Sequence, residues 1–413
     1  MRAAQSTPMT LPDSLPASWR VVSLGRLAEI NPRAARLARD DDAPTTFVPM
    51  AAVDGENGTI ADAQLRPYAE VRKGYTRFAE GDVLFAKISP CMQNGKHAIA
   101  RGLTDRIGFG TTEFHVIRPG ADVLPEWVHL YIRQPSLLRS AKSLFYGSVG
   151  QQRLPASFLE QLRIPLPRLS EQKRIAAALR EQLDAVARLR AAASNQARLA
   201  KATDRAHLRA VWEGQLSRSW PLRRLEEVAL LERGKFTPRP RNDPRYYGGM
   251  YPWIQTGDVE AAGKHVTKYG RTLNGQGLAV SKLFPSGTLV MTIAASVGAV
   301  AILGFDSCMP DSLIGIAPRE GLADSEFLYY TFLHIRSQLE SLAPKTAQAN
   351  LKLATLNPLQ VRIPCLEEQR RVVKQLNERF VWTRRLSGAA EEQVAHAAAL
   401  RAAVLCRAFT GGL

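Results

Sequence analysis

Two segments of the chain, 170–213 and 367–408, repeat an apolar residue every three or four positions, which is the spacing of one helix face. They contain no proline and a single glycine, Gly388, and they are rich in residues that favour helix. At 1.5 Å per residue, each would be a rod of roughly 60–65 Å. An isolated rod would expose its apolar stripe to water, so we expect the two helices to pair. The expected seam positions are Ile175, Leu179, Val186, Leu189, Ala193 and Ala200 in the first helix, and Val372, Leu376, Thr383, Leu386, Ala390, Val394 and Ala397 in the second.

The segments before each helix have a different, mixed pattern. Short apolar runs at 82–88 and 288–294 predict strands, and the segments 126–133 and 325–341 predict helices. Dense Asn-Gly and Asp-Gly pairs between them are typical of turns. Each long helix is therefore expected to follow a globular α/β module.

The segment 283–305 is uncharged over 23 residues and is long enough to cross a membrane as a helix. However, Pro285, Gly287 and a small-residue break at 295–298 interrupt it. These interruptions indicate two buried strands and a turn.

The second half of the chain repeats the first with a period of about 200 residues. Six matches occur in the same order, with offsets between 197 and 206. They are Trp19 with Trp220, Gly81-Asp82-Val83-Leu84 with Gly287-Thr288-Leu289-Val290, Pro125-Glu126-Trp127-Val128 with Ser325-Glu326-Phe327-Leu328, Arg163-Ile164-Pro165 with Arg362-Ile363-Pro364, Glu171-Gln172-Lys173-Arg174-Ile175 with Glu368-Gln369-Arg370-Arg371-Val372, and Leu208, Trp212, Gly214 and Leu216 with Leu405, Phe409, Gly411 and Leu413.

The sequence thus predicts an α+β fold made by tandem duplication of a mixed α/β module plus a long helix. The order module–helix–module–helix returns the second helix antiparallel to the first, so we expect an antiparallel coiled coil with pseudo-twofold symmetry. The predicted boundaries are 11–168 for the first module, 169–217 for the first helix, 218–365 for the second module and 366–413 for the second helix.

Composition indicates a globular protein with a polyanionic partner. Of 413 residues, 45% are hydrophobic, which excludes wholesale disorder. Lys and Arg total 55 against 38 Asp and Glu, a formal net charge of +17, which favours nucleic acid over the weaker alternative of an anionic membrane surface. The four cysteines are far apart and form no CxxC pair, and no signal peptide is visible at the start. Both observations predict a reducing, cytoplasmic location.

A search for catalytic motifs returns none. The sequence lacks a phosphate-binding GxxxxGK[ST] loop, an HExxH motif, Cys/His metal spacing and a GxSxG nucleophile elbow after a strand. We therefore expect no catalytic residue, no metal site and no cofactor site in this chain.

Clusters of basic, amide and aromatic residues fall in the predicted loops at matching places of both halves. Lys and Arg neutralise phosphates, while Gln, Asn and Arg can read base edges. For each cluster the alternative is an ordinary solvated loop, and for the tyrosines it is packing. His97 and His265 are expected to be ordinary loop histidines. The candidate DNA-binding residues are Arg72, Lys73, Tyr75, Arg77, Gln93, Asn94, Lys96, Ser148, Gly150, Gln151, Gln152, Arg153, Lys235, Arg239, Arg241, Tyr246, Tyr247, Lys264, Lys268, Lys345, Gln348, Asn350 and Lys352.

With these features the chain resembles the DNA-specificity subunit of Type I restriction–modification systems over essentially its whole length. That family alternates two target-recognition domains with two long helices. The marks that carry the resemblance are Trp19 and Trp220, Gly81-Asp82, Ile164-Pro165 with 171–175, 368–372, and Ala408-Phe409-Thr410-Gly411-Gly412-Leu413. Two positions depart from the family pattern, Gly287-Thr288 and the first helix end at 211–216, and neither affects the expected fold.

The resemblance implies that each recognition domain reads one half of a bipartite, asymmetric double-stranded DNA site. It implies that the helix pair sets the gap between the halves and docks two methyltransferase subunits, with motor-nuclease subunits added for restriction and phage defence. The chain itself would be non-catalytic. The complex would be a Type I site-specific deoxyribonuclease and adenine DNA methyltransferase, and S-adenosylmethionine, ATP and Mg would bind only in the partner subunits.

Two other classes of function remain open from the sequence. One is a stand-alone architectural or regulatory DNA-binding protein on the same duplicated scaffold. The other is a metal-dependent nuclease or a structural adaptor without DNA contact. Salt-insensitive or absent DNA binding would favour the adaptor.

Overall fold

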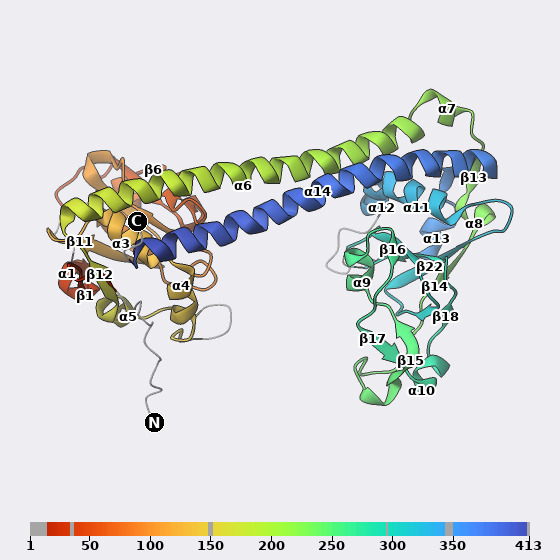
Figure 1. Ribbon diagram of the computed structural model, residues 1–413, viewed down its shortest axis with the longest axis horizontal. Helices are drawn as coiled ribbons and strands as arrows, with labels where there is room; N and C mark the ends of the chain where they lie inside the picture. The colour runs from red at the N-terminus through yellow and green to blue at the C-terminus, as the bar shows by residue number, and fades with distance from the viewer. Residues whose placement is uncertain (1–14, 34–36, 148–151, 295, 343–349, 411–413) are drawn as a thin grey trace. The chain divides into compact units, whose positions relative to one another are not determined.

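The computed structural model describes residues 15–33, 37–147, 152–294, 296–342 and 350–410 (Figure 1). The chain divides into two compact units. Unit 1 comprises Met1–Ser194 and Glu391–Leu413, and unit 2 comprises Asn195–Ala390. The two predicted long helices are confirmed as α6 (Leu169–Trp212) and α14 (Leu366–Ala408). Both helices are shared between the units, so the boundaries predicted from the sequence stay predictions.

Unit 1 contains a central sheet of strand order β2-β11-β8-β9, an outer sheet of order β6-β3-β10-β7, and the short pairs β1–β12 and β4–β5. The strands are β1 (Arg20–Ser23), β2 (Ala28–Ile30), β3 (Pro44–Val48), β4 (Val53–Asp54), β5 (Thr59–Ile60), β6 (Gln64–Pro67), β7 (Thr76–Ala79), β8 (Val83–Ala86), β9 (His97–Ile99), β10 (Ile107–Gly110), β11 (Phe114–Pro119) and β12 (Arg163–Leu166). The short helices are α1 (Leu24–Leu27), η1 (Met50–Ala52), α2 (Tyr68–Val71), η2 (Thr104–Arg106), α3 (Pro125–Ile132), α4 (Pro135–Lys142) and α5 (Ala156–Gln161).

Unit 2 contains a central sheet of order β14-β22-β19-β20-β16, an outer sheet of order β17-β15-β21-β18, and the pair β13–β23. The strands are β13 (Leu222–Arg224), β14 (Ala229–Arg233), β15 (Tyr247–Trp253), β16 (His265–Val266), β17 (Arg271–Leu273), β18 (Leu283–Phe284), β19 (Leu289–Thr292), β20 (Val300–Leu303), β21 (Ser307–Cys308), β22 (Leu313–Pro318) and β23 (Gln360–Arg362). The short helices are α7 (Gln215–Arg218), α8 (Leu225–Val228), η3 (Pro244–Tyr246), α9 (Thr256–Ala261), α10 (Gly275–Ala279), α11 (Ser325–His334), α12 (Arg336–Leu342) and α13 (Leu353–Leu356).

The two units have the same strand topology, which confirms the duplication. In each outer sheet the inner pair is parallel, β3 with β10 and β15 with β21, and the flanking pairs are antiparallel. In each central sheet the middle strand pairs antiparallel with its neighbours, β11 with β2 and β8, and β22 with β14 and β19. The described strands differ in two places: unit 2 adds β16, which pairs in parallel with β20, and unit 1 has the β4–β5 hairpin.

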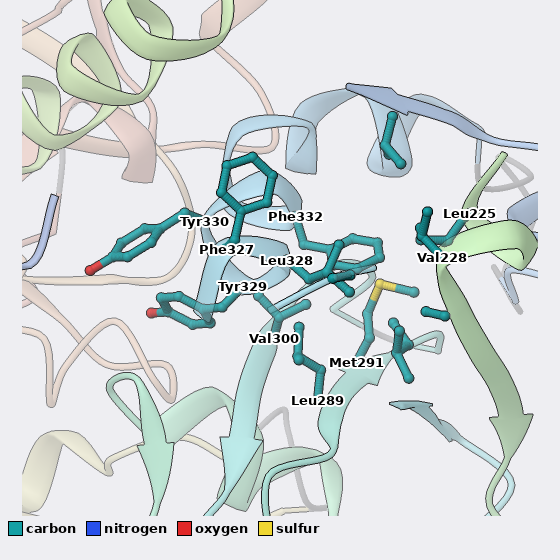
Figure 2. Packing of buried hydrophobic residues seen from close by; sticks show 14 of the residues in the cluster. Leu225, Val228, Leu289, Met291, Val300, Phe327, Leu328, Tyr329, Tyr330 and Phe332 are labelled. Carbon is teal, nitrogen blue, oxygen red and sulfur yellow. The ribbon is translucent and has the colours of Figure 1, made fainter. Parts of the chain in front are cut away.

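The uncharged run at 283–305 contains the two predicted buried strands, β19 and β20, which pair antiparallel, and one further short strand, β18, which belongs to the outer sheet. On β19, Leu289 and Met291 join the cluster around α11, whereas Val290 joins a second cluster that includes Phe284 of the outer sheet. Figure 2 shows Leu289 and Met291 below the α11 side chains. Alternate side chains point to opposite faces of a strand, so a strand covered on both faces is apolar at every position. None of the helices that the structure describes is long and apolar enough to cross a membrane.

The long helices pair in antiparallel fashion within each unit, as predicted. In unit 2, Asp204 of α6 accepts a hydrogen bond from Thr383 of α14. Small buried seam residues line both helices and include Ala193, Ala200, Ala390 and Ala397. Two predicted seam positions are wrong: Leu189 is 62% exposed and Leu386 is 48% exposed. The buried positions Val186, Ala193 and Ala200 recur every seven residues, as do Ala390 and Ala397, so the covered stripe is narrow and both leucines lie at its side.

Each module is completed by the end of the helix that belongs to the other repeat. In unit 1, Phe409 beyond the end of α14 packs on Trp127 and Tyr131 of α3, with ring centroids 4.6 and 4.9 Å apart. In unit 2, Trp212 at the end of α6 packs on Phe327 of α11 at 5.5 Å. The matching sequence ends found by the repeat are therefore core residues.

The buried Gln172 explains why the helix entry contains a Glu-Gln pair. Its amide accepts from Leu124 N at 2.9 Å and donates to the carbonyls of Asp122 and Pro167, both at 3.0 Å. The equivalent Gln369 has the same three kinds of partner, namely Asp324 N, Leu322 O and Pro364 O. One buried amide thus ties the start of each long helix to the loop before α3 or α11.

Candidate nucleic-acid interface

The described ends of the segments 147–153 and 345–352 lie at the same place in both units. Beyond β8, Ile88 forms an antiparallel bridge with Arg153, and beyond β19, Ala294 forms an antiparallel bridge with Asn350. The two bridges are related by the repeat offsets found in the sequence. We call these segments the paired loops. Five candidate residues, Ser148, Gly150, Gln151, Lys345 and Gln348, lie outside the described residues.

The described part of the first paired loop carries several candidate side chains together. Ser89 N donates to the carbonyl of Gln152 at 2.8 Å, and the Ser89 hydroxyl accepts from the amide of Gln93 at 3.2 Å. The Arg153 guanidinium forms an ion pair with Glu113 at 2.7 Å. The structure therefore brings Gln93, Gln152 and Arg153 together beyond the end of the inner strand β8.

The second paired loop is simpler. Asn350 is half-buried, and its Oδ1 has no hydrogen-bond partner within the described part of the chain. Lys352 is exposed and precedes α13 at its N-cap position. Asn350 is thus equivalent to Arg153 of the first loop, whereas Lys352 is equivalent to Pro155, the N-cap residue of α5.

Each unit also has a hollow between its outer sheet and the loop after the first strand of its central sheet. Outer hollow 1 has a volume of about 390 Å³, and outer hollow 2 a volume of about 530 Å³. Both combine aromatic rings with arginines. The candidate residues that line them are Arg72, Tyr75 and Arg77 in hollow 1, and Arg241 and Tyr247 in hollow 2.

Hydrogen bonds through His115 connect outer hollow 1 to Leu154, the residue that follows the first paired loop. Asn31 lines the hollow, and its amide bonds Nδ1 of His115 at 3.1 Å. The other ring nitrogen, Nε2, bonds the carbonyl of Leu154 at 2.9 Å. Burial lowers the pKa of His115, so the neutral ring that accepts at Nδ1 and donates at Nε2 fits both contacts. Sequence reasoning missed Asn31, since its link to His115 joins positions far apart in the chain.

Outer hollow 2 has a similar set of polar contacts. Arg241 pairs with Asp311 at 2.6 Å, and the guanidinium of Arg271 lies 5.4 Å from the ring centre of Tyr247. The Tyr247 hydroxyl donates to the carbonyl of Arg241. Arg271 belongs to the basic cluster of the sequence that also contains Lys264 and Lys268, and the pairing of β17 with β15 brings it to the hollow.

Two candidate lysines are corrected by the structure. Lys264 is only 8% exposed, and its ammonium pairs with Glu326 and bonds Asn377 Oδ1 at 2.7 Å. Burial lowers its pKa, and the two acceptors hold it in the core, where it does not reach phosphate. The Lys96 ammonium donates to the carbonyls of Met50 and Val53 at 2.9 and 3.0 Å, which fixes a turn instead.

The remaining candidates lie at the surface, in short segments that are separate in the sequence. Tyr246 packs against Phe236 at 5.9 Å, and Arg239 donates to backbone carbonyls of its own loop. The exposed ones are Lys73, Asn94, Lys235 and Lys268. Both histidines are wrong as loop residues: His97 lies in β9, fully buried, and stacks on Phe85 at 4.1 Å, and His265 lies in β16.

A cavity of about 700 Å³ in unit 1 lies beside α3 and the β4–β5 hairpin. Its buried Arg133 donates to the carbonyls of Gly55, Glu56 and Asn57, so this side chain holds the hairpin. Burial lowers the pKa of Arg133 to about 9. Among the described side chains, no group of three or more His, Cys, Asp and Glu residues is arranged to hold a metal ion.

This chain is similar to specificity subunits of Type I restriction enzymes. The family model described as Type I restriction modification DNA specificity domain matches residues 16–197 and 218–385. The Type I restriction enzyme EcoAI specificity subunit of Escherichia coli is 41% identical over 165 residues, which cover 40% of this chain and 28% of that subunit. The match thus spans little more than a quarter of the Escherichia coli protein. The putative MjaX specificity subunit of Methanocaldococcus jannaschii is 22% identical over 380 residues, covering 88% of this chain and 87% of that one.

Solved structures share the fold. A chain from a structure of the type I R-M system superposes with a TM-score of 0.74 at 23% identity, covering 97% of this chain and 100% of that chain. The HsdS subunit from Thermoanaerobacter tengcongensis gives a TM-score of 0.50 at 22% identity, covering 97% and 99%.

Proposed function

Since the chain belongs to the Type I restriction modification DNA specificity family, we propose that its two units are target-recognition domains that each read one half of a bipartite DNA site. The observation that carries this proposal is the pair of equivalent loops, which return to the same strand position in both units. Their sequences differ, GSVGQQR against KTAQANLK. Equal placement with unlike side chains is what reading of two different half-sites requires.

The test is genome-wide mapping of methylated adenine in cells with and without the gene, followed by Gln152→Ala and Lys352→Ala. We expect each variant to relax or weaken one half of the methylated motif, because base contacts specify and each loop serves one half-site. Deleting the gene should remove the motif. Equal changes in both halves from either substitution would contradict the assignment.

We further propose that α6 and α14 dock two methyltransferase subunits. Leu189 and Leu386 occupy equivalent positions in the two helices and are both exposed. On α14, Trp382 is 70% exposed beside the exposed Val381. Large apolar side chains exposed on a helix are typical of binding sites for another protein, and equivalent sites in two repeats fit two copies of one partner.

Trp382→Ala is expected to weaken the binding of a methyltransferase subunit by about tenfold or more, because exposed tryptophans often supply much of the binding energy. Co-purification and titration with the partner subunit would measure this. Met250→Ala, which also removes an exposed apolar side chain of unit 2, is the control and should bind as the unmodified protein does. Loss of thermal stability in Trp382→Ala would instead assign the ring to folding.

In this proposal the chain supplies specificity, and its partners supply the chemistry. The complex would methylate adenine with S-adenosylmethionine and, with motor-nuclease subunits, cleave DNA using ATP and Mg. The alternative of a stand-alone DNA-binding protein is not favoured, because the family model matches both repeats. Purification separates the two, since a stand-alone protein would carry no methyltransferase with it.

A further inference from the structure

The backbone of Arg153, at the end of the first paired loop, is held on both sides. Its N–H donates to the carbonyl of Tyr146 at 2.9 Å, and its carbonyl accepts from Tyr146 N at 3.1 Å. On the other side Arg153 bridges Ile88, and the carbonyl of the neighbouring Gln152 accepts from Ser89 N at 2.8 Å. Arg153 is thus the middle of three extended segments, and its placement decides where Gln152 lies.

The side chain of Arg153 is held by Glu113. Its Nε donates to Glu113 Oε2 at 3.0 Å, and its Nη2 donates to Oε1 at 2.7 Å. Glu113 directly precedes β11, and its own backbone carbonyl accepts from Lys87 N at 2.9 Å. A carboxylate that accepts from two N–H groups of one guanidinium fixes its orientation as well as its position. The ion pair therefore fastens the end of the loop to the start of a central-sheet strand.

This ion pair does not suit a direct contact between Arg153 and DNA. An arginine reads guanine with two N–H groups at once, and the pair with Glu113 already uses two of them. The carboxylate also offsets the positive charge that would attract a phosphate, and a phosphate would repel it. The geometry therefore favours a role for Arg153 in placing the loop over a role in reading a base.

Unit 2 has neutral residues at the two equivalent positions. The backbone contact of Glu113 recurs at Ser312, whose carbonyl accepts from Ile293 N at 3.1 Å. Asn350 takes the place of Arg153 in the bridge. An ion pair cannot form between a serine and an asparagine, so the fastening by opposite charges belongs to unit 1. Its loss should therefore affect the half-site that unit 1 reads and leave the other half-site unchanged.

We propose that Glu113 is a positioning residue for DNA recognition by unit 1: through its ion pair with Arg153 it holds the first paired loop, including Gln152, in the place from which the half-site is read. This inference rests on the proposed function, and it assigns Arg153 to the support of the loop. A loop that is fixed before DNA arrives loses less conformational freedom on binding, and its base contacts keep their geometry. The ion pair thus contributes to discrimination without touching DNA.

Glu113→Ala and Arg153→Ala test the proposal in the assembled methyltransferase complex. Each removes the same contact, so each should lower discrimination at the half-site of unit 1 by about tenfold, as one misread base pair does. The double variant should be no worse than either single variant, and the half-site of unit 2 should keep its letters. A direct DNA contact by Arg153 predicts instead that Glu113→Ala leaves discrimination unchanged or strengthens binding.

Glu126→Ala and Arg101→Ala are the matched controls. They remove the same two charges from another ion pair of unit 1, near the start of β8, whereas the paired loop lies beyond its end. Neither control should change the methylated motif. The Arg153 and Glu113 side chains are 36% and 21% exposed, so their removal opens no cavity in the core, and melting curves would check this.

A charge exchange, Glu113→Arg combined with Arg153→Glu, keeps the test decisive if a single variant unfolds. It should restore discrimination at the half-site of unit 1, because the ion pair can form in the reverse sense. Unchanged discrimination in Glu113→Ala, or an exchanged pair that does not restore it, would overturn the inference. If Gln152→Ala still changes that half-site, the proposed function stands without the ion pair. If no methylated motif depends on this chain, both proposals fail.

Discussion

Phe409→Ala is expected to lower the free energy of unfolding of unit 1 by about 3–5 kcal/mol, the usual cost of removing a buried aromatic ring. The ring is 2% exposed and packs on Trp127 and Tyr131, so its loss leaves a cavity against α3. For a unit of this size, the melting temperature should fall by roughly 10 °C. Calorimetry and chemical denaturation would measure both quantities.

The control for this substitution is Leu400→Ala, in the same part of α14. Its side chain is about half exposed, so the expected loss is under about 1 kcal/mol. If the two substitutions had equal effects, the ring would not complete the core of unit 1. Trp212→Ala should act on unit 2 in the same way, since it packs on Phe327.

Insertion of one heptad into both long helices is expected to lengthen the gap between the two half-sites by about three base pairs. Seven helical residues add about 10.5 Å, and one base pair of B-DNA spans about 3.4 Å. Repeating residues 190–196 and 387–393 would place the insertions at equivalent positions of the two helices. Mapping of methylated adenine should then report the same letters in both halves with a longer gap.

An insertion into α6 alone is the control, because it shifts the small-residue seam out of register with α14. That variant should lose stability and methylation together. An unchanged gap in the double insertion would contradict the proposal that the helices set the spacing, and altered half-site letters would contradict the separation of reading from spacing.

Much of the fold was predictable because the repeat carries strong local signals. The long helices follow from apolar spacing and the absence of proline, and the antiparallel pairing follows from the order of segments. The exposure of Leu189 and Leu386 was not predictable from a list of apolar positions. Whether a side chain three residues from the seam is covered depends on the helix rotation, which the packing of both helices decides.

The candidate site was predictable only where residues lie in one loop. The paired loops follow from the repeat offset, and the bridges at Ile88 and Ala294 place them equivalently. Lys264 was misjudged because its acceptors, Glu326 and Asn377, come from segments far along the chain. Outer hollow 2 combines residues of several strands and loops.

The exchange of helix ends between the repeats bears on how the protein is made. The core of unit 1 needs Leu405 and Phe409, which the ribosome adds only after it has made all of unit 2. Unit 1 cannot close as it emerges, and its α3 face with Trp127 stays open until Phe409, beyond the end of α14, has been made. Unit 2 is complete earlier, because its Trp212 comes before Phe327 and the rest of its core in the chain. A premature stop that removes only the final turn of α14 would therefore leave the first-made half of the protein as the unfinished one.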